Sequence, residues 1–214
     1  MSRRRSPGRP GRDSEDLRCT LIDAALTCYT REGVAATSIK AIAAEAGVTP
    51  ALLHYYFGSR DQLRQAVIDD RILPLIQAVQ EKVHGAGEDV AALIGAFMDA
   101  MNAAVTANPW WPALWVREVL CEGGALREVL IEKVGRTFLQ AFVQRFAAAQ
   151  QRGELNGALD PRLLLVSLLG LTLFPAAGAA VWRKLLDADD LGPAEQQKHT
   201  AALLERGLEL RHGL

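Results

Sequence analysis

The sequence is poor in the residues that mark several classes of protein. Its 214 residues include three cysteines and four histidines, and aromatic residues make up 6% of the chain. Three cysteines at no metal-ligand spacing argue against a secreted disulfide scaffold and fit a reducing cytosol. We therefore expect a cytoplasmic protein in which Cys19, Cys28 and Cys121 are buried as small apolar residues.

Clusters of reactive residues are also missing. The four histidines lie far apart, no glycine-rich phosphate loop occurs, and the carboxylates are scattered along the chain. These absences argue against catalysis and against a metal or cofactor site. The sequence therefore predicts a protein that is not an enzyme, with no catalytic residue, no metal ligand and no cofactor.

Helical patterns dominate what the sequence does contain. Half of the residues are hydrophobic, alanine and leucine are abundant, and β-branched runs of strand length are hard to find. Apolar residues recur at helical spacing from about residue 15 onward, with short connections between the segments. The predicted fold class is therefore all-α.

The charge is unevenly distributed along the chain. Residues 1–65 carry ten lysines and arginines against seven acidic residues, whereas the remainder carries fourteen against eighteen. Five arginines, two prolines and two glycines lie in the first twelve residues, so we expect residues 1–13 to form a disordered basic arm. A basic head on an acidic body suggests that the head meets a polyanion.

Cap signals divide the segment after the first predicted helix into short helices. A helix of about two turns is expected over residues 39–46, with Thr37 or Ser38 as its N-cap. The next helix begins at Pro50, after the candidate N-cap Thr49. Both helices are followed by glycine, which predicts that each ends there.

A capping box formed by Ser59 and Gln62 then starts a longer helix. Helix, turn, short helix and capped longer helix is the order of a helix-turn-helix DNA reader. We therefore predict a three-helix DNA-binding domain over residues 14–62 and a helical bundle over residues 63–214.

The helix that starts at Pro50 is expected to present two faces. Leu53 and Phe57 are four residues apart and should pack inward. The other face carries three rings that can donate hydrogen bonds to phosphate oxygens, and its small residues let the backbone approach base edges. Taken singly, the tyrosines at the end of a helix are more typical of a core and the histidine is more typical of an ordinary surface position. Their place within the capped helices favours DNA contact instead. The predicted DNA-binding residues are Thr37, Ser38, Lys40, Thr49, Pro50, Ala51, Leu52, His54, Tyr55, Tyr56 and Arg60.

The stretch ATSIKAIAAEAGVTPALLHYYFGSRDQL, residues 36–63, resembles the DNA-binding signature of the TetR transcriptional regulators, and the resemblance extends back to about Leu17. Members of this family have an N-terminal three-helix reader and a helical C-terminal half that dimerises and usually binds a small effector. The resemblance implies phosphate or groove contacts by the three rings, base contacts by residues 49–52 and a backbone contact by Arg60. It also implies that residues 63–214 form the effector-binding and dimerisation domain.

Two departures from the family pattern lie on the same helix. His54 stands where the family most often has Tyr, and Tyr55 stands where it often has His, so the contact roles of the two rings can be exchanged. Leu52 is apolar where many members carry Ser or Thr. This leaves contact with a thymine methyl group as the expected base readout at Leu52.

In such a regulator the effector pocket lies inside the C-terminal bundle. Aromatic residues and methionines at helical spacing are more often part of a core than of a pocket, but in such a bundle both interpretations stay open. Arg117 and Glu118 are expected to pair with each other or across a dimer, or to orient a ligand. A single helix is expected over residues 126–151. The predicted pocket residues are Phe97, Met101, Trp111, Trp115, Arg117, Glu118, Phe138 and Phe142. The segments WVREVL and GELNGALDP resemble the CecR-like branch of the family over about residues 109–174.

Residues 163–182, LLLVSLLGLTLFPAAGAAVW, carry no charge and are long enough to span a bilayer. A membrane-anchored helical regulator is therefore the alternative interpretation. Gly170, Pro175 and Gly178 favour instead a helix buried in the domain and against a second copy of the chain. With a last helix over residues 194–211, this segment predicts a homodimer formed through the last two helices, without a membrane.

Together these features predict a one-component transcription regulator. We expect a homodimeric repressor that binds a palindromic operator in double-stranded DNA and is released by a small, mainly apolar effector. Repression rather than activation follows from the resemblance alone.

Overall fold

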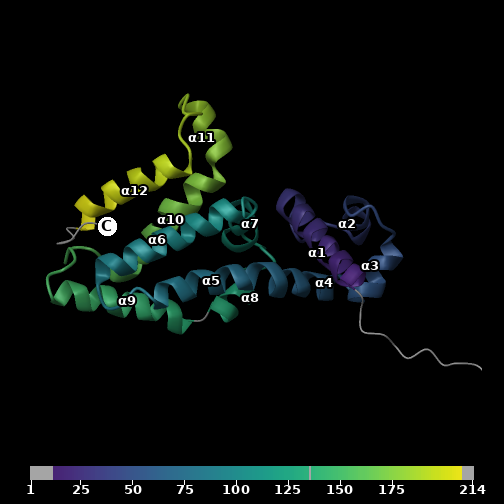
Figure 1. The fold of residues 1–214 in the computed structure, drawn as a ribbon, viewed down its shortest axis with the longest axis horizontal. Helices are drawn as coiled ribbons and strands as arrows, with labels where there is room; N and C mark the ends of the chain where they lie inside the picture. The colour runs from purple at the N-terminus through teal and green to yellow at the C-terminus, as the bar shows by residue number, and fades with distance from the viewer. Residues whose placement is uncertain (1–11, 135, 209–214) are drawn as a thin grey trace, which may run out of the picture. The chain divides into compact units, whose positions relative to one another are not determined.

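The predicted all-α fold is confirmed by the computed structural model, which describes residues 12–134 and 136–208 and places no strand among them (Figure 1). The chain divides into two compact units, and the second unit starts at Leu73. Sequence placed this boundary ten residues earlier. The difference arises because the side chains of Leu63, Val67 and Ile68 are buried, so this segment completes the core of the first unit.

The N-terminal unit consists of short helices packed around α1. Its elements are α1 (Arg12–Glu32), α2 (Ile39–Glu45), α3 (Pro50–Phe57), α4 (Arg60–Val67) and the π-helical turn η1 (Ile68–Ile72). The predicted arm overlaps the first two residues of α1, and its residues 1–11 lie outside the described residues. The core is formed by apolar residues that are at most 1% exposed, Leu21, Ile22, Ala25, Cys28, Tyr29, Ile42, Ala43, Leu53, Leu63 and Ile68.

Two ion pairs join α1 to the π-helical turn. Arg71 Nε donates to Asp23 Oδ1 over 2.7 Å, and Arg18 pairs with Asp70. The turn directly precedes Leu73 and Pro74, which are helical. A proline ring clashes with the carbonyl of the residue four positions earlier, and the wider π-helical geometry accommodates such a residue. Helical structure therefore continues through Pro74 without a break.

The C-terminal unit is a bundle in which α6 packs beside α5 and α9, and α10 packs on α6 and α9 (Figure 1). The helix expected over residues 126–151 is described as two helices on either side of residue 135, which lies outside the described residues. The elements are α5 (Leu73–His84), α6 (Val90–Ala107), α7 (Trp111–Trp115), the π-helical turn η2 (Val116–Leu120), α8 (Arg127–Val134), α9 (Arg136–Gln151), α10 (Pro161–Ala177), α11 (Ala179–Leu185) and α12 (Pro193–Leu208).

The apolar segment 163–182 is not one straight helix. Asp160 caps α10 by accepting from the Arg162 backbone N–H over 2.8 Å. The axis then bends by 74° between α10 and α11. By its length and apolar composition, α6 could cross a membrane. The helices α10 and α11 are long enough to do so only when they are taken together across this bend. Because α6 contributes eight buried residues to the bundle, its apolar composition is explained by the core.

The cysteine prediction is right for one residue and wrong for another. Cys28 is buried in the first core, where burial raises the pKa of its thiol. Cys19 is half-buried. Cys121, by contrast, is exposed, because it follows η2 in the loop that leads to α8.

Candidate nucleic-acid interface and apolar cavity

The local sequence of α3 explains why this short helix forms where it does. Thr49 is extended at the N-cap and Pro50 occupies the first helical position, as predicted. Gly58 ends the helix with φ 71°, a conformation that favours glycine. Leu53 and Phe57 are buried, which leaves the opposite face of the helix free of core contacts.

That opposite face is open to solvent and carries the three ring side chains that were predicted to contact DNA. Tyr55 is 82% exposed, and its ring meets the half-buried ring of Tyr56 edge to face, with centroids 5.5 Å apart. Pro50 and Ala51 are exposed and Leu52 is half-exposed. The helix thus presents small and apolar side chains at its start and aromatic side chains in its second turn.

His54 is exposed but held in place. Its Nδ1 lies 2.9 Å from the carbonyl oxygen of Gly58. Because a carbonyl oxygen only accepts, Nδ1 is the donor in this contact. The hydrogen bond fixes the ring at the end of α3 and leaves Nε2 as the nitrogen available to an outside partner.

The start of α2 corrects one predicted contact. Ser38 is the N-cap, and its side chain accepts from the Ala41 backbone N–H over 3.1 Å. Thr37 is buried instead, and its hydroxyl donates to the Gly33 carbonyl over 2.7 Å. The predicted phosphate contact by the Thr37 hydroxyl is therefore wrong, whereas Ser38 and Lys40 are exposed.

Arg60 has a structural role that the sequence did not reveal. Its guanidinium donates to the carbonyl oxygen of Val34 and, over 2.8 Å, to that of Ala35. These bonds hold the loop between α1 and α2. The residue is exposed, and a guanidinium carries five N–H groups. Contact between Arg60 and DNA backbone stays a prediction.

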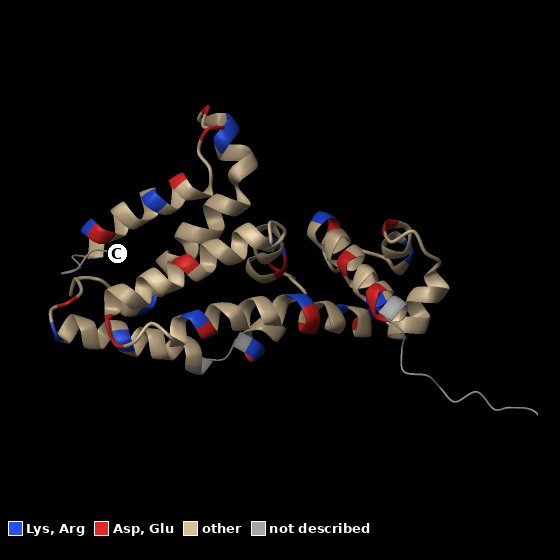
Figure 2. Cartoon of the chain, in the orientation of Figure 1, with Lys and Arg blue, Asp and Glu red and all other residues tan. Residues whose placement is uncertain are grey.

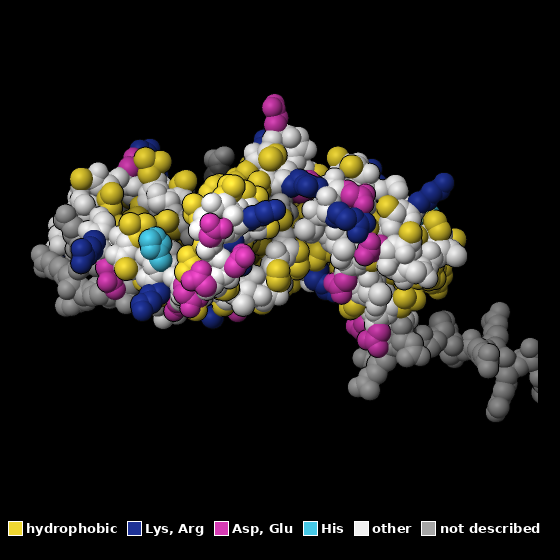
Figure 3. Space-filling model, turned by 90° about the horizontal axis from the view of Figure 1, so that it is seen from above, with side chains coloured by type: hydrophobic (Ala, Val, Ile, Leu, Met, Phe, Trp, Pro, Cys, Tyr) yellow, Lys and Arg dark blue, Asp and Glu magenta, His cyan; other side chains and the backbone are white. Residues whose placement is uncertain are grey.

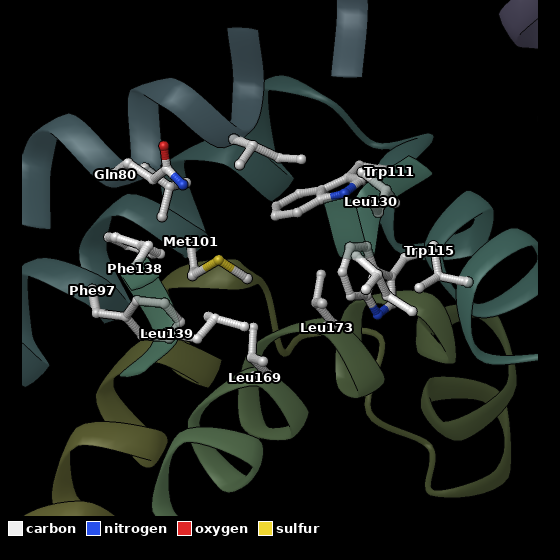
Figure 4. Close-up of a pocket in the computed structure, with 14 residues that line it drawn as sticks. Gln80, Phe97, Met101, Trp111, Trp115, Leu130, Phe138, Leu139, Leu169 and Leu173 are labelled. Carbon is white, nitrogen blue, oxygen red and sulfur yellow. The ribbon is translucent and has the colours of Figure 1, made fainter. Parts of the chain in front are cut away.

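An apolar cavity of about 290 Å³ lies in the C-terminal unit (Figure 4). Five predicted pocket residues line it: Phe97, Met101, Trp111, Trp115 and Phe138. The remaining lining residues come from α5, η2, α8, α9 and α10, and they are Ile76, Val79, Gln80, Val119, Leu130, Ile131, Leu139, Leu169 and Leu173.

Three predicted pocket residues do not line this cavity. Phe142 is buried in the core instead, where its ring meets Phe97 and Phe138 edge to face at centroid distances of 5.4 and 5.3 Å. Arg117 is exposed, and Glu118 is buried with its Oε2 accepting from the Ala125 backbone N–H over 3.0 Å. Glu118 therefore orders the loop that precedes α8.

The aromatic face of α3 lies within a segment that matches a known family. Residues 21–67 match the model of the bacterial regulatory proteins of the tetR family. This segment is similar to the DNA-binding domain of that family. The matched range runs from the buried part of α1 to the end of α4, so it contains the whole helix-turn-helix.

Curated proteins similar to this chain are named as transcription regulators. The nicotine-responsive repressor HdnoR of Paenarthrobacter nicotinovorans is 34% identical over 44% of this chain and 47% of its own length. SrpR of Pseudomonas putida is 28% identical over 69% and 68% of the two chains, and UidR of Escherichia coli K12 is 25% identical over 72% and 78%. The chain thus spans about half the length of HdnoR.

Solved structures share the fold of this chain. The ketosteroid regulator KstR2 of Mycobacterium tuberculosis superposes with a TM-score of 0.72 at 17% identity, over 91% of this chain and 95% of that one. NalD of Pseudomonas aeruginosa, a secondary repressor of a multidrug efflux pump, gives 0.61 at 24% identity over 94% and 99%. The likeness confirms an N-terminal helix-turn-helix domain followed by a helical domain.

Sequence reasoning missed the α5 side of the cavity. Ile76, Val79 and Gln80 share one face of α5. Nothing in the sequence separated Gln80 from the other polar residues of α5, which are typical of a solvated face.

Proposed function

We propose that this TetR-family regulator is a homodimeric repressor that binds a palindromic operator and is released when a small, mainly apolar molecule enters the cavity. The observation that carries the proposal is α3, which is anchored by two buried residues and exposes its other face within a DNA-binding domain. The names of HdnoR and NalD as repressors support repression as the direction of control.

In this proposal α3 lies in the major groove. Tyr55 donates to a phosphate oxygen. Nε2 of His54 is the second contacting atom, because Nδ1 donates to Gly58, and Nε2 donates to phosphate only from the imidazolium form, in which both ring nitrogens carry hydrogen. Ser38, Lys40 and Arg60 are the further phosphate contacts. Such contacts fix the position of the helix on the duplex and make the affinity depend on salt.

Base readout is assigned to the start of α3. The helix contains no Arg, Lys, Asn or Gln, the residues that form bidentate pairs with guanine or adenine. Ala51 and Leu52 are instead suited to apolar contact with thymine methyl groups. Replacing contacted thymines by uracil removes only the methyl group, so it should weaken binding of the wild type and have less effect on Leu52→Ala.

Dimerisation is assigned to α10, α11 and α12. Their exposed apolar side chains are Leu163, Val166, Phe174, Val181, Leu185 and Leu203. Arg162 is the single charged residue of α10, which Figure 2 draws almost wholly in tan. Figure 3 shows hydrophobic side chains gathered on the surface of the C-terminal unit. A two-fold axis brings the same patch from two chains together. The two readers of such a dimer then match an operator with inverted half-sites.

A ligand acts as an effector only if it binds the non-DNA state better than the DNA-bound state. In the proposed switch, occupation of the cavity changes how the two readers are spaced. A cytoplasmic location fits this function, and the membrane-anchored alternative is tested by whether the full chain purifies without detergent. The likeness of WVREVL and GELNGALDP to the CecR-like branch supports the proposal that the C-terminal half belongs to that branch.

The test is a shift assay at fixed salt with duplexes from around the protein's own gene. Tyr55→Ala is expected to weaken binding by about tenfold or more, since each dimer loses two charge-assisted hydrogen bonds. Tyr55→Phe keeps the ring but removes the hydroxyl. If the hydroxyl makes the contact, this variant should lose most of the DNA affinity that Tyr55→Ala loses. Equal binding by all three proteins would remove α3 from the interface.

A further inference from the structure

The chemistry of the cavity wall restricts the ligand more than its apolar character alone suggests. Of the 14 residues that line the cavity, none carries a charge, and Gln80 is the single polar side chain apart from the tryptophan indoles. Figure 4 shows the Gln80 amide at one end of the site, with Trp111 and Trp115 at the other and Met101 between them.

We infer that the effector is a compact, uncharged, ring-containing molecule with one hydrogen-bonding group, which it places against the amide of Gln80. This inference rests on the proposed role of the cavity as the effector site. Moving an ionised group from water into such a site leaves it without a counter-charge and is costly. A neutral hydroxyl or carbonyl is matched by an amide, which both donates and accepts.

The small volume of the cavity favours a compact ligand. A volume of about 290 Å³ lies at the lower end of the range of roughly 300 to 1,000 Å³ that small-molecule pockets span. Phe97 and Phe138 stand on one side of Met101, and the two indoles stand on the other (Figure 4). Aromatic walls of this kind favour edge-to-face or offset contacts with a planar ring.

A cationic group lies outside this wall. Arg145 lines a separate cavity of about 70 Å³ together with His84, and Phe138 lines both cavities. The Arg145 guanidinium donates to the Gly87 carbonyl. An anionic ligand would need to displace Phe138 to reach this cation, so the geometry disfavours carboxylates in the larger cavity.

The test compares three two-ring probes of similar shape, namely 2-naphthol, 2-methylnaphthalene and 2-naphthoate at pH 7. Binding to the full chain without DNA is measured by calorimetry. We expect 2-naphthol to bind at least about tenfold more tightly than the anionic 2-naphthoate. Gln80→Leu should reduce the affinity ratio of 2-naphthol to 2-methylnaphthalene by about threefold or more. Gln77→Leu, an exposed glutamine on the same helix, is the matched control and should leave that ratio unchanged.

Three results would overturn the inference: equal or tighter binding of 2-naphthoate, an unchanged ratio in Gln80→Leu, or no binding by any probe. Arg145→Gln should leave 2-naphthol binding unchanged. Release from operator DNA is measured separately. A probe that binds with the expected selectivity but leaves the DNA complex intact would contradict the proposed switch while supporting the ligand class.

Discussion

The two units of this chain differ in how completely they bury their own apolar surface. Among the described residues, the N-terminal unit exposes one large hydrophobic residue, Tyr55, on the face assigned to DNA. The C-terminal unit exposes eleven, and eight of these lie between Leu163 and Leu203. The first unit is therefore complete as a folded reader, whereas the second has a surface suited to a second copy of the chain and a cavity suited to a ligand.

The largest expected effect comes from placing a charge on that surface. Val166→Glu on α10 should prevent dimerisation, because an unpaired carboxylate would be buried between two apolar faces. Loss of the second reader should then lower operator affinity by about a hundredfold. Light scattering and a shift assay measure the two consequences.

The matched control is Leu120→Glu, which also replaces an exposed apolar residue but lies on η2. It should remain dimeric and bind operator normally. A dimeric Val166→Glu protein would show that the exposed face of α10 is not the interface.

A core substitution in the reader sharpens the contrast between the units. Leu53→Ala removes a side chain that is 1% exposed and should destabilise the N-terminal unit by about 2 to 5 kcal/mol. The C-terminal unit should keep its dimeric state. Amide hydrogen exchange resolves the two units.

Leu52→Ala is the companion variant, because Leu52 is the half-exposed neighbour of Leu53. It should change stability by less than about 1 kcal/mol while weakening DNA binding. If Leu53→Ala lowered protection of α6 and α9 as much as that of α1, the two units would not be independent.

The smallest expected effect concerns Tyr29 in the first core. Burial raises the pKa of its phenol to about 12, and its hydroxyl has no hydrogen-bond partner among the residues that the structure describes. The folded state therefore holds this proton more tightly than the unfolded chain, whose tyrosines ionise near pH 10. The contribution of Tyr29 to the unfolding free energy is present below pH 10 and falls as pH rises towards 12.

Tyr29→Phe should change the unfolding free energy at pH 7 by no more than about 1 kcal/mol, because the hydroxyl makes no bond that the variant would lose. Denaturant titrations at pH 7 and above pH 10 compare the two proteins. A wild type that lost no more stability than the variant above pH 10 would contradict the buried assignment.

Local signals explain what could be predicted from the sequence. The capping box of Ser59 and Gln62 depends on two residues three positions apart, so spacing alone identified it. The choice between Thr37 and Ser38 depends instead on which hydroxyl is buried. That is decided by how the loop packs on α1, which short-range patterns do not encode.

Positions within the cavity show the same limit. Phe138 and Phe142 are one turn apart on α9, and sequence assigned both to the pocket. The structure places Phe138 at the cavity wall and Phe142 in the core behind it, because the two rings differ in which helices they meet. Gln80 was missed for the converse reason, since a polar residue at an inward position is recognised only from the helices around it.

The central claim is that α3 of each copy in a dimer reads half of a palindromic site. The most direct measurement is selection of bound duplexes from a random pool by the full chain at fixed salt. We expect an enriched inverted repeat with thymines at the positions next to Ala51 and Leu52. Tyr55→Ala should lose this enrichment. Recovery of no enriched sequence, or the same enrichment with Tyr55→Ala, would contradict it.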